Sequence, residues 1–214
     1  GGGAGGLQAL VKNGFSVENK RVVVAGTGPL LLVVAEYLKS KGAEVLLIAE
    51  QTSRAKLARF GLGLISQPKK IAQALSLQTK LLGIRYLTNA FISSAEGNGK
   101  LEAVELTQNG KTTRIECDML ACGFHLVPQL ETAQMLGCKV ESGFVEVDDF
   151  QRTSIADIYC AGETTGIGGV EKSLVEGRIA GYAAVGESAK AEALFPRRLK
   201  TQQFTEKLNE TFAL

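Results

Sequence analysis

A short glycine turn and a carboxylate further along the chain are the residues of this sequence best suited to chemistry. The turn reads Gly26-Thr27-Gly28-Pro29, and Glu50 follows about 24 residues after its first glycine. Gly26 lets the chain turn sharply, and Gly28 leaves no side chain between backbone N–H groups and a bound pyrophosphate. A carboxylate at Glu50 is placed to accept hydrogen bonds from an adenosine ribose, which favours NAD over NADP. The spacing therefore predicts an adenine dinucleotide site.

The elements around this turn have the order that such a site requires. A hydrophobic strand over 20–25 precedes the turn, an apolar helix runs over 30–41, and a second strand ends at Glu50. Pro29 suits a first helical turn, and the helix N-terminus at Leu30 favours an anion. The third glycine of G-x-G-x-x-G falls at Leu31, where glycine would let helix and strand pack closely. This leaves a second interpretation open, in which the βαβ unit keeps its fold but has lost or changed its nucleotide.

The composition of the chain argues against several classes of function. The chain has 214 residues, is 45% hydrophobic and carries a formal net charge of +2, with no Trp. It can bury one large or two small domain cores, and its scattered charges do not indicate a nucleic-acid partner. The longest apolar run, 22–34, is too short and too broken to span a bilayer, and we expect no signal peptide. We therefore expect a cytoplasmic protein with no membrane span.

The cysteines indicate neither a metal site nor a redox disulfide. They form no C-x-x-C pair, and His125 is the sole histidine. We expect buried free thiols, no metal, and a solvent-facing loop at His125. The four cysteines are Cys117, Cys122, Cys138 and Cys160.

The rest of the first 124 residues completes a Rossmann-like domain. Residues 1–6 superficially repeat the G-x-G-x-x-G pattern, but no strand precedes them, so we expect a flexible lead-in followed by a short helix. Alternating segments joined by glycine turns, including the hairpin signal Asn109-Gly110, predict a three-stranded meander before the last strand. The expected helices are 7–13, 53–60 and 66–82; the expected strands are 84–87, 90–96, 101–108, 112–117 and 119–122.

A second glycine cluster follows a predicted buried strand over 158–161. Gly162 and the glycines up to Gly169 place backbone N–H groups at the start of a long helix that begins at Val170, whose positive end can stabilise an anionic group. Glu163 could accept a hydrogen bond from a sugar or ribityl hydroxyl. The alternative is a plain turn that leads into a surface helix. Other expected elements are a helix over 130–136, a strand over 144–147 and a helical tail.

The segment 153–163 resembles a known motif. It reads Thr-Ser-Ile-Ala-Asp-Ile-Tyr-Cys-Ala-Gly-Glu and is similar to T-S-x-x-x-I-Y-A-x-G-D, the C-terminal FAD motif of the pyridine nucleotide–disulfide oxidoreductase superfamily. The resemblance implies that Glu163, one methylene longer than the usual Asp, contacts the FAD ribityl or pyrophosphate region. It also implies that Gly169 and Val170 lie near the flavin pyrimidine edge, and that Gly123, in a segment similar to A-x-G…P, lies against the nucleotide.

Five further segments resemble the FAD subunits of heteromeric amino-acid and opine dehydrogenases, a group that includes hydroxyproline dehydrogenase and hydrogen cyanide synthase subunits. The likeness runs from about residue 4 to the end, and Gly-Pro-Leu-Leu is typical of the group, which accounts for Leu31. It implies a flavin-dependent oxidoreductase with FAD as cofactor, a small-molecule amino-acid, imino-acid or opine substrate, and other dehydrogenase subunits as partners. For the Gly26–Gly28 turn, NAD and another adenine nucleotide both stay open as the ligand. The segments are 4–10, 26–32, 123–128, 166–171 and 176–181.

Two parts of that family are missing from this sequence. The resemblance implies an N-terminal FAD half before residue 1 and a cysteine-rich iron–sulfur segment after the tail, so we expect an incomplete FAD site and self-association or binding to another subunit. No catalytic acid or base can be identified, and a non-catalytic nucleotide-binding or assembly module remains the alternative function. The expected fold class is α/β: a three-layer Rossmann-like dinucleotide-binding domain with an inserted meander, plus the C-terminal half of an FAD-binding domain. The expected parts are a lead-in over 1–19, the Rossmann domain over 20–124, the FAD-binding part over 125–186 and a helical tail over 187–214.

Overall fold

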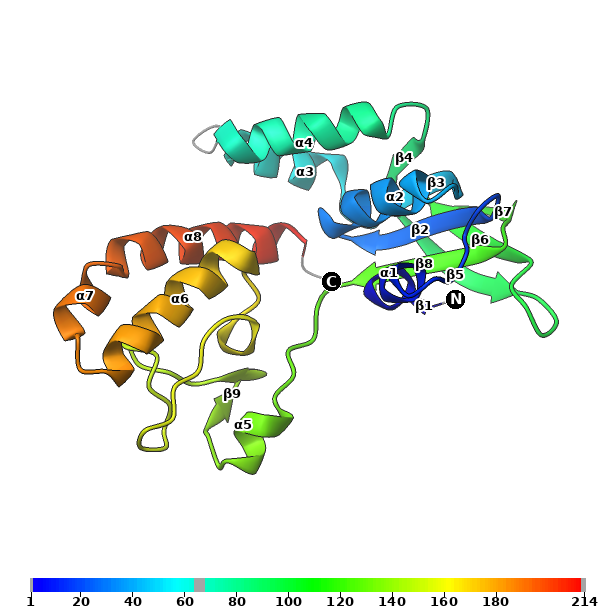
Figure 1. The fold of residues 1–214 in the computed structure, drawn as a ribbon. Coiled ribbons are helices and arrows are strands. Elements are labelled where there is room, and N and C mark those ends of the chain that lie inside the picture. Colours follow the sequence, from blue (N-terminus) through cyan, green and yellow to red (C-terminus); the bar gives the residue numbers. More distant parts are fainter. Residues whose placement is uncertain (1, 64–67, 213–214) are drawn as a thin grey trace. The chain divides into compact units, whose positions relative to one another are not determined.

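A computed structural model describes residues 2–63 and 68–212 (Figure 1). The chain divides into two compact units, which are treated separately below. The first unit comprises residues 1–125 together with 211–214, and the second comprises residues 126–210.

The first unit is built on a five-stranded sheet in the order β1-β8-β2-β3-β4 (Figure 1). All four strand pairs are parallel. The central strands read as hydrophobic runs because both faces of the sheet are covered. The strands are β1 (Gly2–Gly3), β2 (Arg21–Thr27), β3 (Glu44–Glu50), β4 (Arg85–Thr88) and β8 (Met119–Phe124).

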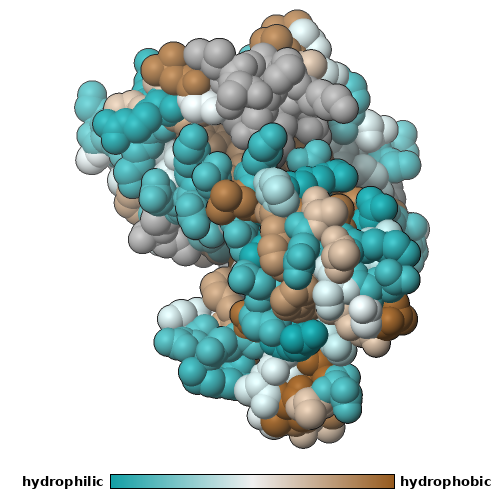
Figure 2. Space-filling model, turned by 90° about the vertical axis from the view of Figure 1, so that its left-hand side faces the viewer, coloured by the Kyte–Doolittle hydropathy of each residue, from teal (hydrophilic) through white to brown (hydrophobic). Residues whose placement is uncertain are grey.

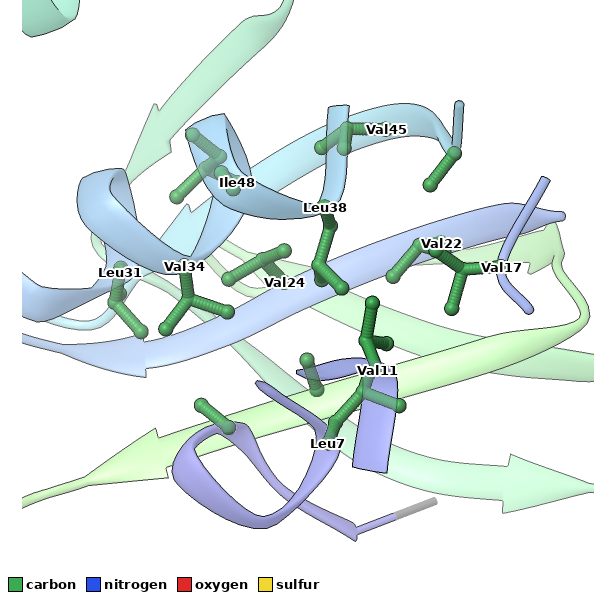
Figure 3. Close-up of a cluster of buried hydrophobic side chains, with 14 of the residues drawn as sticks. Leu7, Val11, Val17, Val22, Val24, Leu31, Val34, Leu38, Val45 and Ile48 are labelled. Carbon is green, nitrogen blue, oxygen red and sulfur yellow. The ribbon is translucent and has the colours of Figure 1, made fainter. Parts of the chain in front are cut away.

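Helices cover one face of this sheet. α1 (Ala4–Lys12) and α2 (Leu30–Ser40) bury apolar side chains against alternate residues of β2, among them Val22 and Val24 (Figure 3). Gly42, with φ +86°, ends the α2 segment before β3 begins. Two further helices, α3 (Arg54–Gly63) and α4 (Pro68–Lys80), follow β3; the predicted residues 66 and 67 lie outside the described chain.

The other face of the sheet packs against an antiparallel meander. Val23 and Ala25 of β2 alternate with the residues that face the helices, and they join a second buried cluster with Val104 and Leu106 of the meander. The meander order is β5-β6-β7. This arrangement confirms the predicted α/β fold with an inserted three-stranded meander. Its strands are β5 (Ala90–Glu96), β6 (Ala103–Gln108) and β7 (Lys111–Glu116).

The expectation of a flexible N-terminal lead-in is wrong. Gly2 and Gly3 form the edge strand β1, which pairs in parallel with Ala121 and Cys122 of β8. The helix that follows begins at Ala4, which is buried in the sheet–helix core. Glycine weakens a strand because it has no side chain to pack, so the residue types carry no signal for this pairing.

The second unit is mainly helical. α6 (Gly169–Ala184) contributes Val175 and Ile179 to a small core that includes Ala191 of the next helix. The predicted long helix and helical tail are present. The elements are α5 (Glu131–Met135), β9 (Val140–Glu141), β10 (Phe144–Val145), the 3-10 turn η1 (Glu163–Thr165), α6, α7 (Ser188–Glu192) and α8 (Phe195–Thr211).

The predicted buried strand over 158–161 does not form. Tyr159 makes one isolated bridge to Arg152, and Cys160 N–H donates to the carbonyl of Gln151. The segment is half-buried, and no longer strand lies beside it among the described residues. A strand needs a partner for its backbone groups, so an apolar run without one bonds locally instead.

The face drawn in Figure 2 is largely hydrophilic, with hydrophobic side chains scattered in small groups. Over the described residues, none of the helices has the length and apolar character needed to cross a membrane.

Candidate functional site

The residues of the predicted dinucleotide site meet at the carboxyl ends of the parallel strands. Gly26 of β2 lies in register with Glu50 of β3 on one side and with Gly123 of β8 on the other. Glu50 in turn lies in register with Thr88 of β4. The chain leaves β2 at the point where strand order reverses, which is where open α/β sheets bind ligands.

Gly26 is required by the close approach of two strands. Its φ is +148°, and a Cβ placed on it would lie 2.0 Å from the carbonyl oxygen of Gly123. That contact is with backbone, so no rotamer change could relieve it. Only glycine fits here, as the predicted turn requires.

Gly28 directs its amide toward the acid. It has φ +100°, and its N–H donates to Glu50 Oε2 at 2.9 Å. Pro29 then stands at the N-cap position of α2 in the right-handed helical region, with no side-chain cap, and Leu30 is 40% exposed. The start of α2 therefore has no cap from its own side chains, and the Glu50 carboxylate is bonded to the amide of the residue before Pro29.

Glu50 is fully buried and held from several directions. Besides Gly28, the amide of Thr52 donates to its Oε1 at 2.8 Å and the hydroxyl of Tyr86 to its Oε2 at 3.4 Å. The hydroxyls of Thr27 and Thr52 lie 3.0 Å apart beside it. No described Lys or Arg forms an ion pair with Glu50, so its charge is met by hydrogen-bond donors alone.

The pKa of Tyr86 responds to the Glu50 carboxylate. Its partial burial, together with the nearby Glu50 carboxylate, raises the pKa of Tyr86 above its ordinary value. The neutral phenol donates to the Glu50 carboxylate and helps to hold its orientation. Sequence reasoning misses Tyr86, because it is one tyrosine in a short strand and no spacing marks it.

Leu31 occupies the place of the missing third glycine without opening the helix–strand contact. It is 1% exposed and lies in the core drawn in Figure 3. A Cβ placed on Gly123 would be 2.9 Å from Leu31 Cδ2. The side chain thus fits against a glycine of the neighbouring strand, which explains how α2 stays close to the sheet.

The second predicted cluster lies in the second unit, at the start of α6. Gly162 is buried with φ +91°, and Gly169 has φ +78° with open space around its missing side chain. Glu163 accepts from the Gly169 amide through Oε1 at 2.8 Å, while its buried Oε2 has no partner among the described residues. Val170, the next residue, is 71% exposed. The structure therefore brings an acid and a helix start together and leaves one buried carboxylate oxygen without a hydrogen-bond partner among the described residues.

A buried ion pair that sequence reasoning misses holds this loop. Lys172 Nζ lies 2.8 Å from Glu176, and the two side chains are only 5% and 2% exposed. Glu176 accepts from the Gly162 amide at 2.9 Å and from the Thr165 hydroxyl at 2.8 Å, while Lys172 also donates to the Gly162 carbonyl at 3.1 Å. The available signal is helical spacing, because Lys172 and Glu176 share a face with the buried Val175.

The thiols and the histidine differ in their surroundings. All four cysteines are free, as predicted, but the expectation that all are buried is wrong, because Cys122 and Cys160 are only half-buried. Burial raises the pKa of both Cys117 and Cys122. His125 is exposed, as expected, but its Nε2 lies 2.6 Å from the carbonyl oxygen of Phe212. Within residues 2–63 and 68–212, no group of three or more His, Cys, Asp or Glu could hold a metal ion.

Comparison with known proteins gives the family context of this geometry. Residues 1–187 match the family described as "Pyridine nucleotide-disulphide oxidoreductase". The hydrogen cyanide synthase subunit HcnB of Pseudomonas protegens is 30% identical over 191 residues, covering 82% of this chain and 41% of that protein. An opine oxidase subunit of Rhizobium meliloti is 27% identical over 192 residues, covering 85% of this chain and 36% of that protein. The chain thus spans about two fifths of the length of these curated relatives.

Among solved structures, the thioredoxin reductase of T. acidophilum superimposes with a TM-score of 0.56 at 22% identity. The match covers 92% of this chain and 56% of that one. At this level of identity the likeness establishes the fold.

Proposed function

The chain belongs to the pyridine nucleotide–disulphide oxidoreductase family, and from this premise we propose that it is part of a flavin-dependent oxidoreductase subunit with an adenine dinucleotide site in its first unit. The proposed substrates are amino acids, imino acids or opines, and the proposed partners are other subunits of the same enzyme. The names of the HcnB and opine oxidase relatives, both of which are subunits, support this choice.

We assign nucleotide binding to Gly26, Thr27, Gly28, Pro29, Leu30, Glu50 and Gly123. The single observation that carries the assignment is the Glu50–Gly28 contact at 2.9 Å, because it sets a buried carboxylate directly beside the turn. The N-terminus of α2 favours the negative charge of a pyrophosphate. The uncompensated Glu50 charge would attract ribose hydroxyls and repel a 2′-phosphate, so we propose NAD over NADP.

The residues of the second unit fit an FAD contact. Gly162, Glu163, Gly169 and Val170 would lie along the flavin, with the unpartnered Glu163 Oε2 available to a ribityl or pyrophosphate-side hydroxyl. The open space at Gly169 and the exposed start of α6 leave room for the ligand. FAD, when bound, supplies the group that accepts hydride or electrons, and the protein supplies orientation and electrostatics.

The nucleotide site is tested by titrating the protein with NADH and with NADPH. We expect NADH to bind about tenfold or more tightly than NADPH, a typical scale for one charge–charge discrimination, and Glu50→Gln to narrow that ratio because it keeps the shape and removes the charge. Glu44→Gln is the matched control, since Glu44 is an exposed acid at the other end of β3. Equal or tighter binding of NADPH to the unsubstituted protein would contradict the preference, and binding of neither would favour a lost or changed nucleotide.

A further inference from the structure

An aromatic side chain lies over the glycine turn. A Cβ placed on Gly28 would be 3.9 Å from Phe212 Cγ, which is van der Waals contact. Phe212 belongs to the first unit with the turn, and it is only 4% exposed. The ring of Phe212 therefore bounds the space beside Gly28 and leaves room there for a methyl-sized group.

Two contacts hold Phe212 in this place. His125 Nε2 lies 2.6 Å from its carbonyl oxygen, and the Phe60 ring meets its ring edge to face, with centroids 5.3 Å apart at 74°. His125 follows directly after β8 and has φ +75°, so the backbone that carries it takes the left-handed conformation uncommon for a residue other than glycine. Both the backbone and the ring of Phe212 are thus fixed at the carboxyl ends of the sheet.

We propose that Phe212 occupies the nucleotide side of the Gly28 turn in the nucleotide-free protein and that an adenine dinucleotide must displace it. The proposal rests on the nucleotide site proposed above. A glycine at this position serves to let the pyrophosphate approach the backbone, and a pyrophosphate is larger than the methyl-sized space between Gly28 and the Phe212 ring, so the two compete for one place. The His125 and Phe60 contacts stabilise the covered state, and the nucleotide stabilises the open one.

This competition lowers the apparent affinity for nucleotide. A ligand that binds only the open state has its dissociation constant raised by the inverse of the open fraction. By reciprocity, bound nucleotide releases Phe212 from the turn. Phe212 therefore acts as an internal ligand of the dinucleotide site.

The first test measures ADP binding by calorimetry to the full chain and to Phe212→Ala and Phe212→Leu. ADP carries the adenosine and pyrophosphate that the turn would bind. We expect Phe212→Ala to bind ADP about five- to fiftyfold more tightly, since its open fraction rises, and Phe212→Leu to fall between the two. Phe91→Ala is the matched control, because Phe91 is a 43% exposed phenylalanine of β5 in the same unit, and it should leave the affinity unchanged.

The outcomes separate this proposal from the proposed nucleotide site. Equal ADP affinity in all four proteins would overturn the competition and leave the nucleotide site standing. Weaker binding to Phe212→Ala would also overturn it, because the ring would then contact the nucleotide favourably. If none of the proteins bound ADP, the nucleotide site itself would fall and this proposal with it.

A second test follows the position of the side chain at residue 212 directly. It does not depend on whether the Phe212→Ala and Phe212→Leu variants fold well. The sequence contains no tryptophan, so Phe212→Trp introduces a single fluorophore over the turn. We expect blue-shifted emission without ligand and a shift to longer wavelength as ADP, which does not quench by energy transfer, saturates the site. Emission that stays constant while calorimetry shows ADP binding would overturn the displacement.

Discussion

In each of the two glycine loops of this chain, a buried carboxylate accepts a hydrogen bond from a glycine amide, but only one of the two carboxylates has a counter-ion. In the first unit the amide of Gly28 donates to the buried carboxylate of Glu50, and in the second the amide of Gly162 donates to the buried carboxylate of Glu176, each at 2.9 Å. Each carboxylate comes from a different element than its glycine. A buried acid thus fixes a backbone that has no side chains of its own to pack.

The difference lies in the counter-ion. Glu176 is neutralised by the buried Lys172, whereas Glu50 has only hydrogen-bond donors around it among the described residues. A carboxylate that is paired with a buried ammonium group attracts a ligand only weakly. A carboxylate without a counter-ion still attracts hydroxyl groups and repels phosphate. The acid in the second unit therefore holds a loop, while the acid in the first would also select a ligand under the function proposed above.

Removing the cation from the second unit tests this difference most strongly. Lys172→Met leaves the Glu176 carboxylate buried without its counter-ion, and we expect the free energy of unfolding of that unit to fall by about 3–5 kcal/mol. Because a chain of two units need not unfold in one step, hydrogen exchange of the α6 amides during urea titration is the measurement.

Lys190→Met is the matched control for that substitution. Lys190 of α7 forms an exposed ion pair with Glu187, the N-cap residue of the same helix. Such exposed pairs contribute about 0–1 kcal/mol to the free energy of unfolding. If both substitutions had the same small effect, the loop would not depend on the buried pair. A double variant, Lys172→Met with Glu176→Leu, should recover much of the loss because it buries no charge.

Alanine substitutions at the glycines of the two loops should also differ in how much stability they cost. Gly26→Ala places a Cβ 2.0 Å from backbone, while Gly168→Ala places one 2.4 Å from Lys172 Cδ and Thr205 Oγ1, which are side-chain atoms. We expect Gly26→Ala to destabilise the first unit by about 2–4 kcal/mol and Gly168→Ala to cost the second about 1–3 kcal/mol, since side chains can shift. Amide exchange of β2 and of α6 measures each, and a larger loss at Gly168 would show that the second loop is the more rigid.

The sequence predicted the local parts of this molecule well. The spacing of Gly26, Gly28 and Glu50 depends on one βαβ unit, and the structure brings these residues together as expected. Alternation and the Asn109-Gly110 turn predicted the meander for the same reason. Contacts within one unit of about 30 residues are encoded in spacing alone.

Contacts between distant segments could not be predicted. Leu31 looked like a defect in the motif because its fit depends on Gly123, which lies on another strand. The approach of Phe212 to Gly28 depends on the path of the whole chain. The strand expected over 158–161 was wrong for a related reason, since an apolar pattern shows what a segment could bury but not whether a partner strand lies beside it.

The smallest effect we predict concerns the opposite end of the sheet that carries Glu50. Asp118 accepts from the Arg21 amide at 2.8 Å and pairs with the Arg21 guanidinium at 3.2 Å, and these bonds lower the pKa of Asp118 below its ordinary value. A carboxyl whose pKa is lower in the folded than in the unfolded chain stabilises the fold above its unfolded pKa, and this contribution is lost as pH falls through the folded one.

We therefore expect Asp118→Asn to be slightly less stable than the unsubstituted chain near about pH 7, with the difference shrinking below about pH 4 as the carboxyl of the unsubstituted chain is protonated. Since both side chains of the Asp118–Arg21 pair are more than a third exposed, solvent screening keeps the effect small. Urea midpoints of β2 amide exchange across this range measure it. A difference in stability that stayed constant with pH would show that the amide of Asn, rather than the missing charge, is responsible.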